Sequence, residues 1–195
     1  DRHVAGGRAD QLALIHDSPL QGKITKFTYA ELLHEVKTLA AIMQDFGVAK
    51  GDRVILYMPM VPEAVVAMLA CARIGAVHSV VFGGFAAKEL ATRIEDAKPK
   101  LILSASCGLE PGRIVQYKPL LDEAIRLSSE KPDVCIILQR PQQTCELVSG
   151  RDHDWAILRE RAIAAKKSAD CVAVEATDPL YILYTSGTTG IPKGV

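Results

Sequence analysis

The sequence of 195 residues lacks the cysteine, histidine and hydrophobic patterns that mark several classes of protein. Its five cysteines are scattered and form no C-x-x-C pair, which favours reduced thiols in an intracellular protein over a disulfide framework. The five histidines show no H-E-x-x-H spacing, so we predict no metal site within this sequence. The formal net charge is zero, which indicates no general attraction to nucleic acid or to an anionic membrane. No apolar run reaches the roughly 18 residues of a membrane span.

The amino-acid composition is typical of a globular protein with a sizeable core. Hydrophobic residues make up 49% of the sequence and charged residues 24%. We expect strands at residues 12–16, 54–57, 77–82, 100–104, 134–138 and 181–184, helices at 28–47, 62–74, 87–97, 119–127 and 154–167, and loops at 105–118 and 141–153. Continuously apolar strands that alternate with helices predict a layered α/β fold, with a mostly parallel sheet flanked by helices.

Local signals mark the boundaries of the first two helices. Thr28 with Glu31 three residues later forms a capping box, and Gly47 suits the left-handed position after a helix. Pro62 suits the first position of the second helix, which is apolar nearly all round and is predicted to be deeply packed. In the last helix we expect four apolar side chains to face inward: Trp155, Ile157, Leu158 and Ile163.

The last fifteen residues change abruptly from an apolar strand to a polar, glycine-rich loop. Residues 181–195 read Tyr-Ile-Leu-Tyr-Thr-Ser-Gly-Thr-Thr-Gly-Ile-Pro-Lys-Gly-Val. Glycines let successive N–H groups converge on an anion, hydroxyls add donors, and a lysine neutralises phosphate. The loop is not a Walker A sequence, because Lys193 follows Pro192 and precedes Gly194. We predict a nucleotide phosphate site at the carboxyl ends of the strands, made by Thr185, Ser186, Gly187, Thr188, Thr189, Gly190 and Lys193. The alternative is a flexible connector.

The order Thr-Ser-Gly-Thr-Thr-Gly-x-Pro-Lys-Gly resembles the phosphate loop of the adenylate-forming enzymes, which include acyl-CoA synthetases, luciferases and peptide-synthetase adenylation domains. Residues 57–63, 70–78 and 81–85 look like the short-chain acyl-CoA synthetases, the acetyl- and propionyl-CoA synthetase branch. The resemblance implies that residues 1–195 are an incomplete part of the large N-terminal AMP-binding domain of a longer enzyme. Residues 1–27 would be an approach segment and residues 28–195 the α/β region that ends in the phosphate loop. We expect both ends of the sequence to be cuts.

A second motif, Ser-Cys-Gly-Leu-Glu-Pro-Gly-Arg at residues 106–113, has the residues of a tight bend that presents an arginine. Taken alone, the motif favours an ordinary surface arginine over a binding residue. The resemblance places Glu110, Pro111, Gly112 and Arg113 where acetyl-CoA synthetases carry Arg-Ala-Gly-Arg against the 3′-phosphate region of CoA. Gly112 and Arg113 match that pattern, whereas Glu110 puts an acid where a base would meet phosphate. The sequence of residues 106–122 is more similar to propionyl-CoA synthetases than to acetyl-CoA synthetases.

The resemblance implies a ligase reaction in two steps. A carboxylate attacks ATP to give acyl-adenylate and pyrophosphate, and the thiol of CoA then displaces AMP. ATP, Mg²⁺ and coenzyme A would be the cofactors, a short-chain carboxylate the substrate, and the cytoplasm, or the mitochondrial matrix of a eukaryote, the compartment. The acyl pocket and the activating lysine of the family lie outside this sequence, so we assign no catalytic residue within it and expect the segment alone to be inactive.

Two other functions remain open at this stage. One is acetate rather than propionate activation, because the pocket that measures the acyl chain lies outside the sequence. The other is a non-catalytic nucleotide- or phosphate-binding module. For His78 and for Gly83 and Gly84 we favour structural roles, and for Tyr117 and Trp155 packing roles. Cys107 is expected in a loop.

Overall fold

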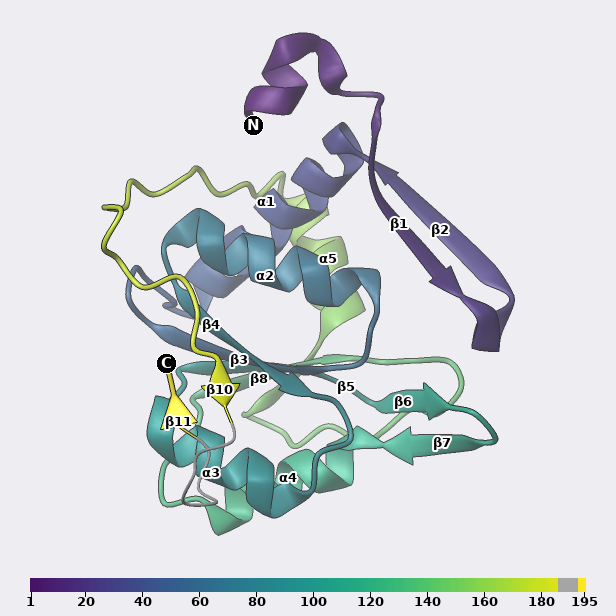
Figure 1. Cartoon of the computed structure of the whole chain (residues 1–195), viewed down its shortest axis with the longest axis vertical. Coiled ribbons are helices and arrows are strands. Elements are labelled where there is room, and N and C mark those ends of the chain that lie inside the picture. The colour runs from purple at the N-terminus through teal and green to yellow at the C-terminus, as the bar shows by residue number, and fades with distance from the viewer. Residues whose placement is uncertain (186–192) are drawn as a thin grey trace.

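The computed structural model describes residues 1–185 and 193–195 (Figure 1). Its centre is a five-stranded sheet made of β3 (Arg53–Met58), β4 (Val77–Phe82), β5 (Leu101–Ala105), β8 (Val134–Leu138) and β9 (Asp152–Asp154). The strands lie in the order β4-β3-β5-β8-β9, and every neighbouring pair is parallel. The predicted layered α/β fold with a parallel sheet is therefore confirmed.

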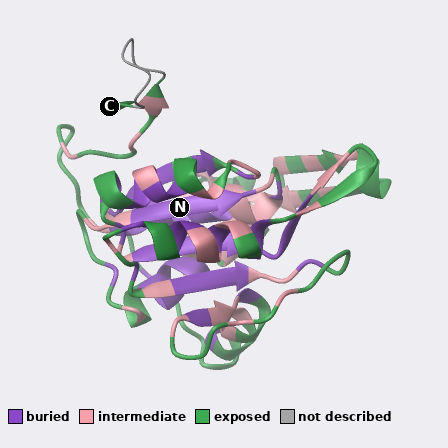
Figure 2. Cartoon of the chain, turned by 90° about the horizontal axis from the view of Figure 1, so that it is seen from below, coloured by how far each residue is buried: buried purple, intermediate pink, exposed green. Residues whose placement is uncertain are grey.

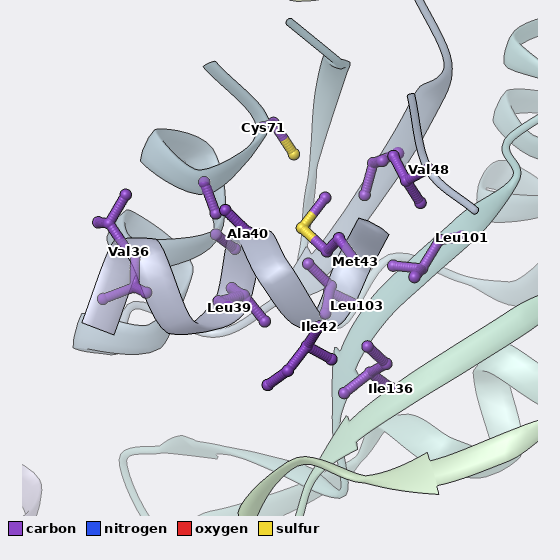
Figure 3. Close-up of a cluster of buried hydrophobic side chains, with 14 of the residues drawn as sticks. Val36, Leu39, Ala40, Ile42, Met43, Val48, Cys71, Leu101, Leu103 and Ile136 are labelled. Carbon is purple, nitrogen blue, oxygen red and sulfur yellow. The ribbon is translucent and has the colours of Figure 1, made fainter. Parts of the chain in front are cut away.

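Helices cover both faces of this sheet. α1 (Tyr29–Asp45), α2 (Pro62–Ile74) and α5 (Trp155–Ala164) lie on one face, and α3 (Ala87–Ala97) and α4 (Tyr117–Leu127) lie on the other (Figure 1). Buried residues are concentrated in the strands and in the helix surfaces turned toward them (Figure 2). Each face of the sheet carries a hydrophobic core. In the core formed with α1, α2 and α5, Ile42 and Met43 of α1 lie beside Leu103 and Ile136 of the sheet (Figure 3). Each such buried side chain stabilises the fold by roughly 1.5–3 kcal/mol, so these two cores dominate stability.

The local signals set several boundaries where they were predicted. Thr28 Oγ1 accepts a hydrogen bond from the Glu31 amide (3.2 Å) and Glu31 Oε2 accepts one from the Thr28 amide (2.8 Å), which completes the capping box. Gly47 and Gly75 adopt positive φ angles of 76° and 70° directly after α1 and α2. α2, α3, β4 and β8 have the predicted bounds.

An antiparallel hairpin precedes the sheet. It consists of β1 (Leu12–Ser18) and β2 (Lys23–Thr28), joined by a 3₁₀ turn, η2 (Pro19–Gln21), and preceded by an irregular helical turn, η1 (Val4–Arg8). β1 confirms the first expected strand and extends it by two residues. β2 escaped prediction because Lys-Ile-Thr-Lys-Phe-Thr lacks a strict period of two. Of the helices in the described ranges, none combines the length and the apolar character that a bilayer crossing requires.

Four predicted elements between residues 105 and 167 need correction. Residues 105–118 are not a loop, because they contain the hairpin β6 (Cys107–Glu110) and β7 (Arg113–Gln116), in which Cys107 is buried. α4 starts at Tyr117, and β9 occupies the end of the predicted loop 141–153. α5 ends at Ala164, and Ile157 and Ile163 are 49% and 36% exposed. α5 meets the core through Trp155, Leu158 and Ala162, so two of the four predicted inward side chains, Trp155 and Leu158, are confirmed.

The prediction of a buried strand at residues 181–184 is wrong. The segment meets the edge strand β4 in a single parallel bridge, in which the Ile182 amide donates to the His78 carbonyl (2.9 Å). Tyr181 and Leu183 are each 53% exposed, so the segment is not a buried strand of the sheet. His78 itself is buried, as a structural role requires. Burial lowers its pKa.

Candidate functional site

The two ends of the predicted phosphate loop lie next to each other. β10 (Tyr184–Thr185) pairs antiparallel with β11 (Lys193–Gly194), and the amides of Leu183 and Val195 each donate to the other's carbonyl (2.9 and 3.0 Å). The pairing places Thr185 directly opposite Lys193, and both residues are exposed. The predicted contacts of Ser186, Gly187, Thr188, Thr189 and Gly190 lie outside the described residues.

This stem rests on the C-terminal half of α3. The Tyr184 hydroxyl donates to Asp96 Oδ2 (2.6 Å), and the Arg93 guanidinium lies 5.1 Å from the centre of the Tyr184 ring. Burial, and the acceptor Asp96, raise the pKa of the Tyr184 phenol. The stem is therefore anchored beside α3, and not at the end of a strand of the main sheet as the sequence predicted.

The second predicted motif forms the turn of the β6–β7 hairpin. Pro111 and Gly112 make the bend, with a positive φ of 76° at Gly112, so the predicted tight bend is confirmed. Arg113 Nε and Nη2 both contact Glu110 Oε2, at 2.7 and 2.6 Å. Glu110, which departs from the acetyl-CoA synthetase pattern, is thus paired with Arg113, which matches it. The sequence analysis did not predict this interaction.

Two glycines enclose the Tyr117 ring at the base of this hairpin. A Cβ atom on Gly83 would lie 2.4 Å from the Tyr117 hydroxyl, and one on Gly108 would lie 2.2 Å from it. Nearby, the Tyr57 hydroxyl donates to the Phe85 carbonyl (2.9 Å) and accepts from the Gly84 amide (3.3 Å). Burial raises the pKa of Tyr57 to about 12. The packing roles predicted for Gly83 and Tyr117 are therefore confirmed.

A cavity of about 500 Å³ opens at the carboxyl ends of β3 and β4, where parallel sheets commonly bind ligands. Met58 and Phe82, the last residues of these strands, line it together with residues 16–21 of the N-terminal hairpin. Glu110 of the predicted CoA motif also lines this cavity, and so does Leu183, just before the stem of the phosphate loop. The cavity therefore lies between the two predicted motifs.

Arg140 is a polar residue of this cavity, beside Tyr117, that the sequence analysis did not single out. Arg140 is 7% exposed, its Nη1 donates to the Cys107 carbonyl (3.1 Å), and its amide donates to Ser106 Oγ (2.8 Å). Burial raises the pKa of the Tyr117 phenol, and the charge of Arg140 opposes this rise. The only sequence signal for Arg140 was its position two residues after the apolar strand 134–138, where a parallel sheet presents its ligand-binding edge.

Comparison with known proteins finds similarity over nearly the whole chain. The profile of the AMP-binding enzyme family matches residues 1–195. The chain is 54% identical, over its whole length, to rat "Acyl-CoA synthetase short-chain family member 3, mitochondrial" and 47% identical, over 95% of its length, to Escherichia coli K12 "Propionate--CoA ligase". The solved structure of acetoacetyl-CoA synthetase from Streptomyces lividans superposes on 98% of the chain with a TM-score of 0.84 and 30% identity. The chain spans only 28–29% of the length of these proteins.

Proposed function

The chain belongs to the family of AMP-binding enzymes, and from this premise we propose that the longer protein of which it forms part is a short-chain acyl-CoA synthetase. It joins a carboxylic acid to CoA at the expense of ATP, releasing AMP and pyrophosphate, and propionate is the preferred acid. The observation that carries the proposal is the ten-residue phosphate-loop sequence, held at both ends by the stem that pairs Thr185 with Lys193.

The phosphate loop acts in the first step. Charge grows on pyrophosphate as it leaves, and donors and cations held in advance around it stabilise that charge. Lys193 supplies the positive charge, and Thr185, Ser186, Gly187, Thr188, Thr189 and Gly190 supply hydroxyl and amide donors. The anchoring of Tyr184 on Asp96 fixes where the loop leaves the body of the protein. Mg²⁺ supplies further charge to the phosphates; the described residues contain no group of three or more metal-ligating side chains, and we assign it no ligand in this chain.

The β6–β7 turn acts in the second step, by binding the phosphorylated end of CoA. Glu110, Pro111, Gly112 and Arg113 form this contact in the proposal. Arg113 holds two of its donors against Glu110, and its remaining N–H groups are free to meet a phosphate. Glu110 therefore orients the guanidinium and at the same time weakens its attraction for an anion.

This division of roles predicts opposite effects of two substitutions in the full-length protein. Arg113→Ala should raise KM for CoA about tenfold, the loss expected for a hydrogen bond to a charged group. Glu110→Gln should lower it about two- to fivefold, because breaking an exposed ion pair costs little and frees the arginine. Both effects should shrink with 3′-dephospho-CoA. Arg126→Ala, which breaks the comparable exposed pair with Glu123, is the control. Equal KM values in all variants would refute the CoA contact.

The acid preference is tested by AMP formation from ATP and CoA with acetate, propionate and butyrate. One methylene in an apolar pocket is worth about 1–3 kcal/mol, so a true preference for propionate should reach roughly tenfold in kcat/KM. An acetate optimum would keep the reaction and overturn the preference. If no short acid gives turnover while ATP still binds, the non-catalytic nucleotide-binding function replaces the proposal. The mitochondrial matrix or the cytoplasm is the proposed compartment, and the rat relative is named as a mitochondrial protein.

A further inference from the structure

Among the buried cations of the described residues, Arg140 alone lacks an acidic partner. Arg73 pairs with Asp1, Arg93 with Glu89, and Lys118 with Asp122 and Asp152. Arg140 is as deeply buried as these residues, yet its side chain has a single partner in the described part of the chain, the Cys107 carbonyl. A guanidinium carries five N–H donors, so most of its donors and its whole charge are left for another group. The unpaired nitrogen atoms of Arg140 are not among the water-excluded unpaired atoms of the described residues, so they open onto the cavity that Arg140 lines.

The Tyr117 phenol is a second donor of the same kind. Tyr117 is 5% exposed, and among residues 1–185 and 193–195 no hydrogen bond to its hydroxyl is formed. Gly83 and Gly108 fix the ring from both sides, so the hydroxyl cannot turn away to find one. Tyr117 and Arg140 both line the cavity of about 500 Å³ at the carboxyl ends of β3 and β4. Two nearly buried donors, one of them charged, thus face the same space.

The acids that line the cavity do not neutralise Arg140. Glu110 is committed to Arg113, and Asp17 is exposed on the N-terminal hairpin and forms no ion pair with any described residue. His16 forms a hydrogen bond through its Nε2 atom to the Met60 carbonyl (3.0 Å). Most of the remaining wall is apolar, with Met58, Val81 and Leu109 among its side chains. The cavity therefore combines a positive, donor-rich spot with walls that suit an uncharged body.

We propose that this cavity binds an oxyanion, with Arg140 and Tyr117 as the two donors that receive it. The ligand is a carboxylate or a phosphate group attached to a small organic molecule, whose apolar part lies against Met58 and Leu109. The site shares Glu110 with the wall of the proposed CoA contact, but its donors, Arg140 and Tyr117, belong neither to that contact nor to the phosphate loop. Its existence does not depend on the proposed reaction, since it rests on the burial and the unused donors of two side chains.

The first test uses the full-length wild-type protein and phenylglyoxal, which modifies arginine. Modification of Arg140 and of the exposed Arg126 is followed by peptide mass spectrometry without ligand and with propionate, inorganic phosphate or CoA. We expect at least one of these anions to slow modification of Arg140 about tenfold or more, with Arg126 unchanged. Protection by propionate alone identifies a carboxylate site, and protection by phosphate and CoA identifies a phosphate site. If no anion protects Arg140, or if the reagent never reaches it, the proposal is overturned.

The second test measures the affinity of the protecting anion by calorimetry in variants of both donors. Tyr117→Phe removes only the hydroxyl and keeps the ring between the two glycines, and it should weaken binding roughly tenfold. Arg140→Met should weaken binding of the anion more. Arg140→Lys should recover part of the loss, because lysine keeps the positive charge but lacks the planar set of guanidinium donors. Arg126→Met and Tyr29→Phe are the controls. Unchanged affinity in Tyr117→Phe and Arg140→Lys would overturn the site. Binding is recorded without turnover, so a protein that forms no acyl-CoA can still give the expected result.

Discussion

Replacing Asp152 by alanine should destabilise the protein by about 3 kcal/mol, the lower end of the cost of breaking a buried ion pair, because Lys118 keeps Asp122 as its second partner. The Asp152 side chain is fully buried, and its carboxylate lies 2.9 Å from Lys118 Nζ and 2.6 Å from Arg151 Nε. Lys118 is only 4% exposed, so water cannot replace the lost carboxylate. The pair joins α4 to β9, and its loss should loosen the margin of the sheet. Urea unfolding at pH 7, followed by circular dichroism, measures the change.

The same carboxylate predicts how stability depends on pH. Burial by itself raises the pKa of Asp152, but hydrogen bonds from Arg151, the Val148 amide and Lys118 bring it below its usual value. Its contribution is therefore complete above the unfolded pKa of about 3.9 and disappears as pH falls through the lower folded pKa. The wild-type protein should lose stability more steeply than Asp152→Ala on acidification below pH 4.

Two controls separate this pair from ordinary surface charge. Glu123→Ala removes an exposed carboxylate from the same helix, α4, and should leave the unfolding free energy nearly unchanged. The double variant Lys118→Met/Asp152→Ala should recover part of the loss, because it also removes the buried cation that has lost one of its two carboxylate partners. An Asp152→Ala protein as stable as the wild type would contradict the buried network.

Replacing Gly108 by alanine should destabilise the protein by about 3 kcal/mol, at the upper end of the range for overpacked cores. The new methyl group would lie 2.2 Å from the Tyr117 hydroxyl and 2.5 Å from Cζ of its ring. Tyr117 cannot retreat, because Gly83 leaves no room on the opposite side and the ring packs against Tyr57 at 5.2 Å. Thermal unfolding monitored by tyrosine fluorescence and circular dichroism would measure the loss.

The cause of this effect is steric and can be separated from backbone strain. Gly108 does not have a positive φ, so alanine meets no conformational penalty there. Gly6→Ala, at a glycine with nothing within 4 Å of a Cβ atom, should change stability little. The double variant Gly108→Ala/Tyr117→Leu should be more stable than the sum of the two single losses predicts. Strict additivity would mean that the two residues do not clash.

The sequence predicted most accurately the elements whose bounds depend on residues close together in the chain, and least accurately those that depend on contacts between distant segments. α2, α3, β4 and β8 were predicted to the residue, because prolines, glycines and apolar runs act within a few positions. The 107–116 hairpin was missed because Cys-Gly-Leu-Glu-Pro-Gly-Arg looks like a loop until its strands pair. The exposure of residues 181–184 was also missed, since an apolar run reveals its tendency to be buried but not whether a neighbour covers it.

The sequence by itself determined the parallel α/β layers, the order of the elements and the phosphate-loop motif, since each depends on composition and spacing along the chain. Only the tertiary structure decided that Glu110 pairs with Arg113, that Lys118 pairs with Asp152, and that Arg140 and Tyr117 face one cavity. Arg140 and Cys107 are joined by a hydrogen bond across 33 positions of sequence. Such contacts depend on how strands and helices stack, and the periodicity of a sequence does not record which distant side chains this stacking brings together.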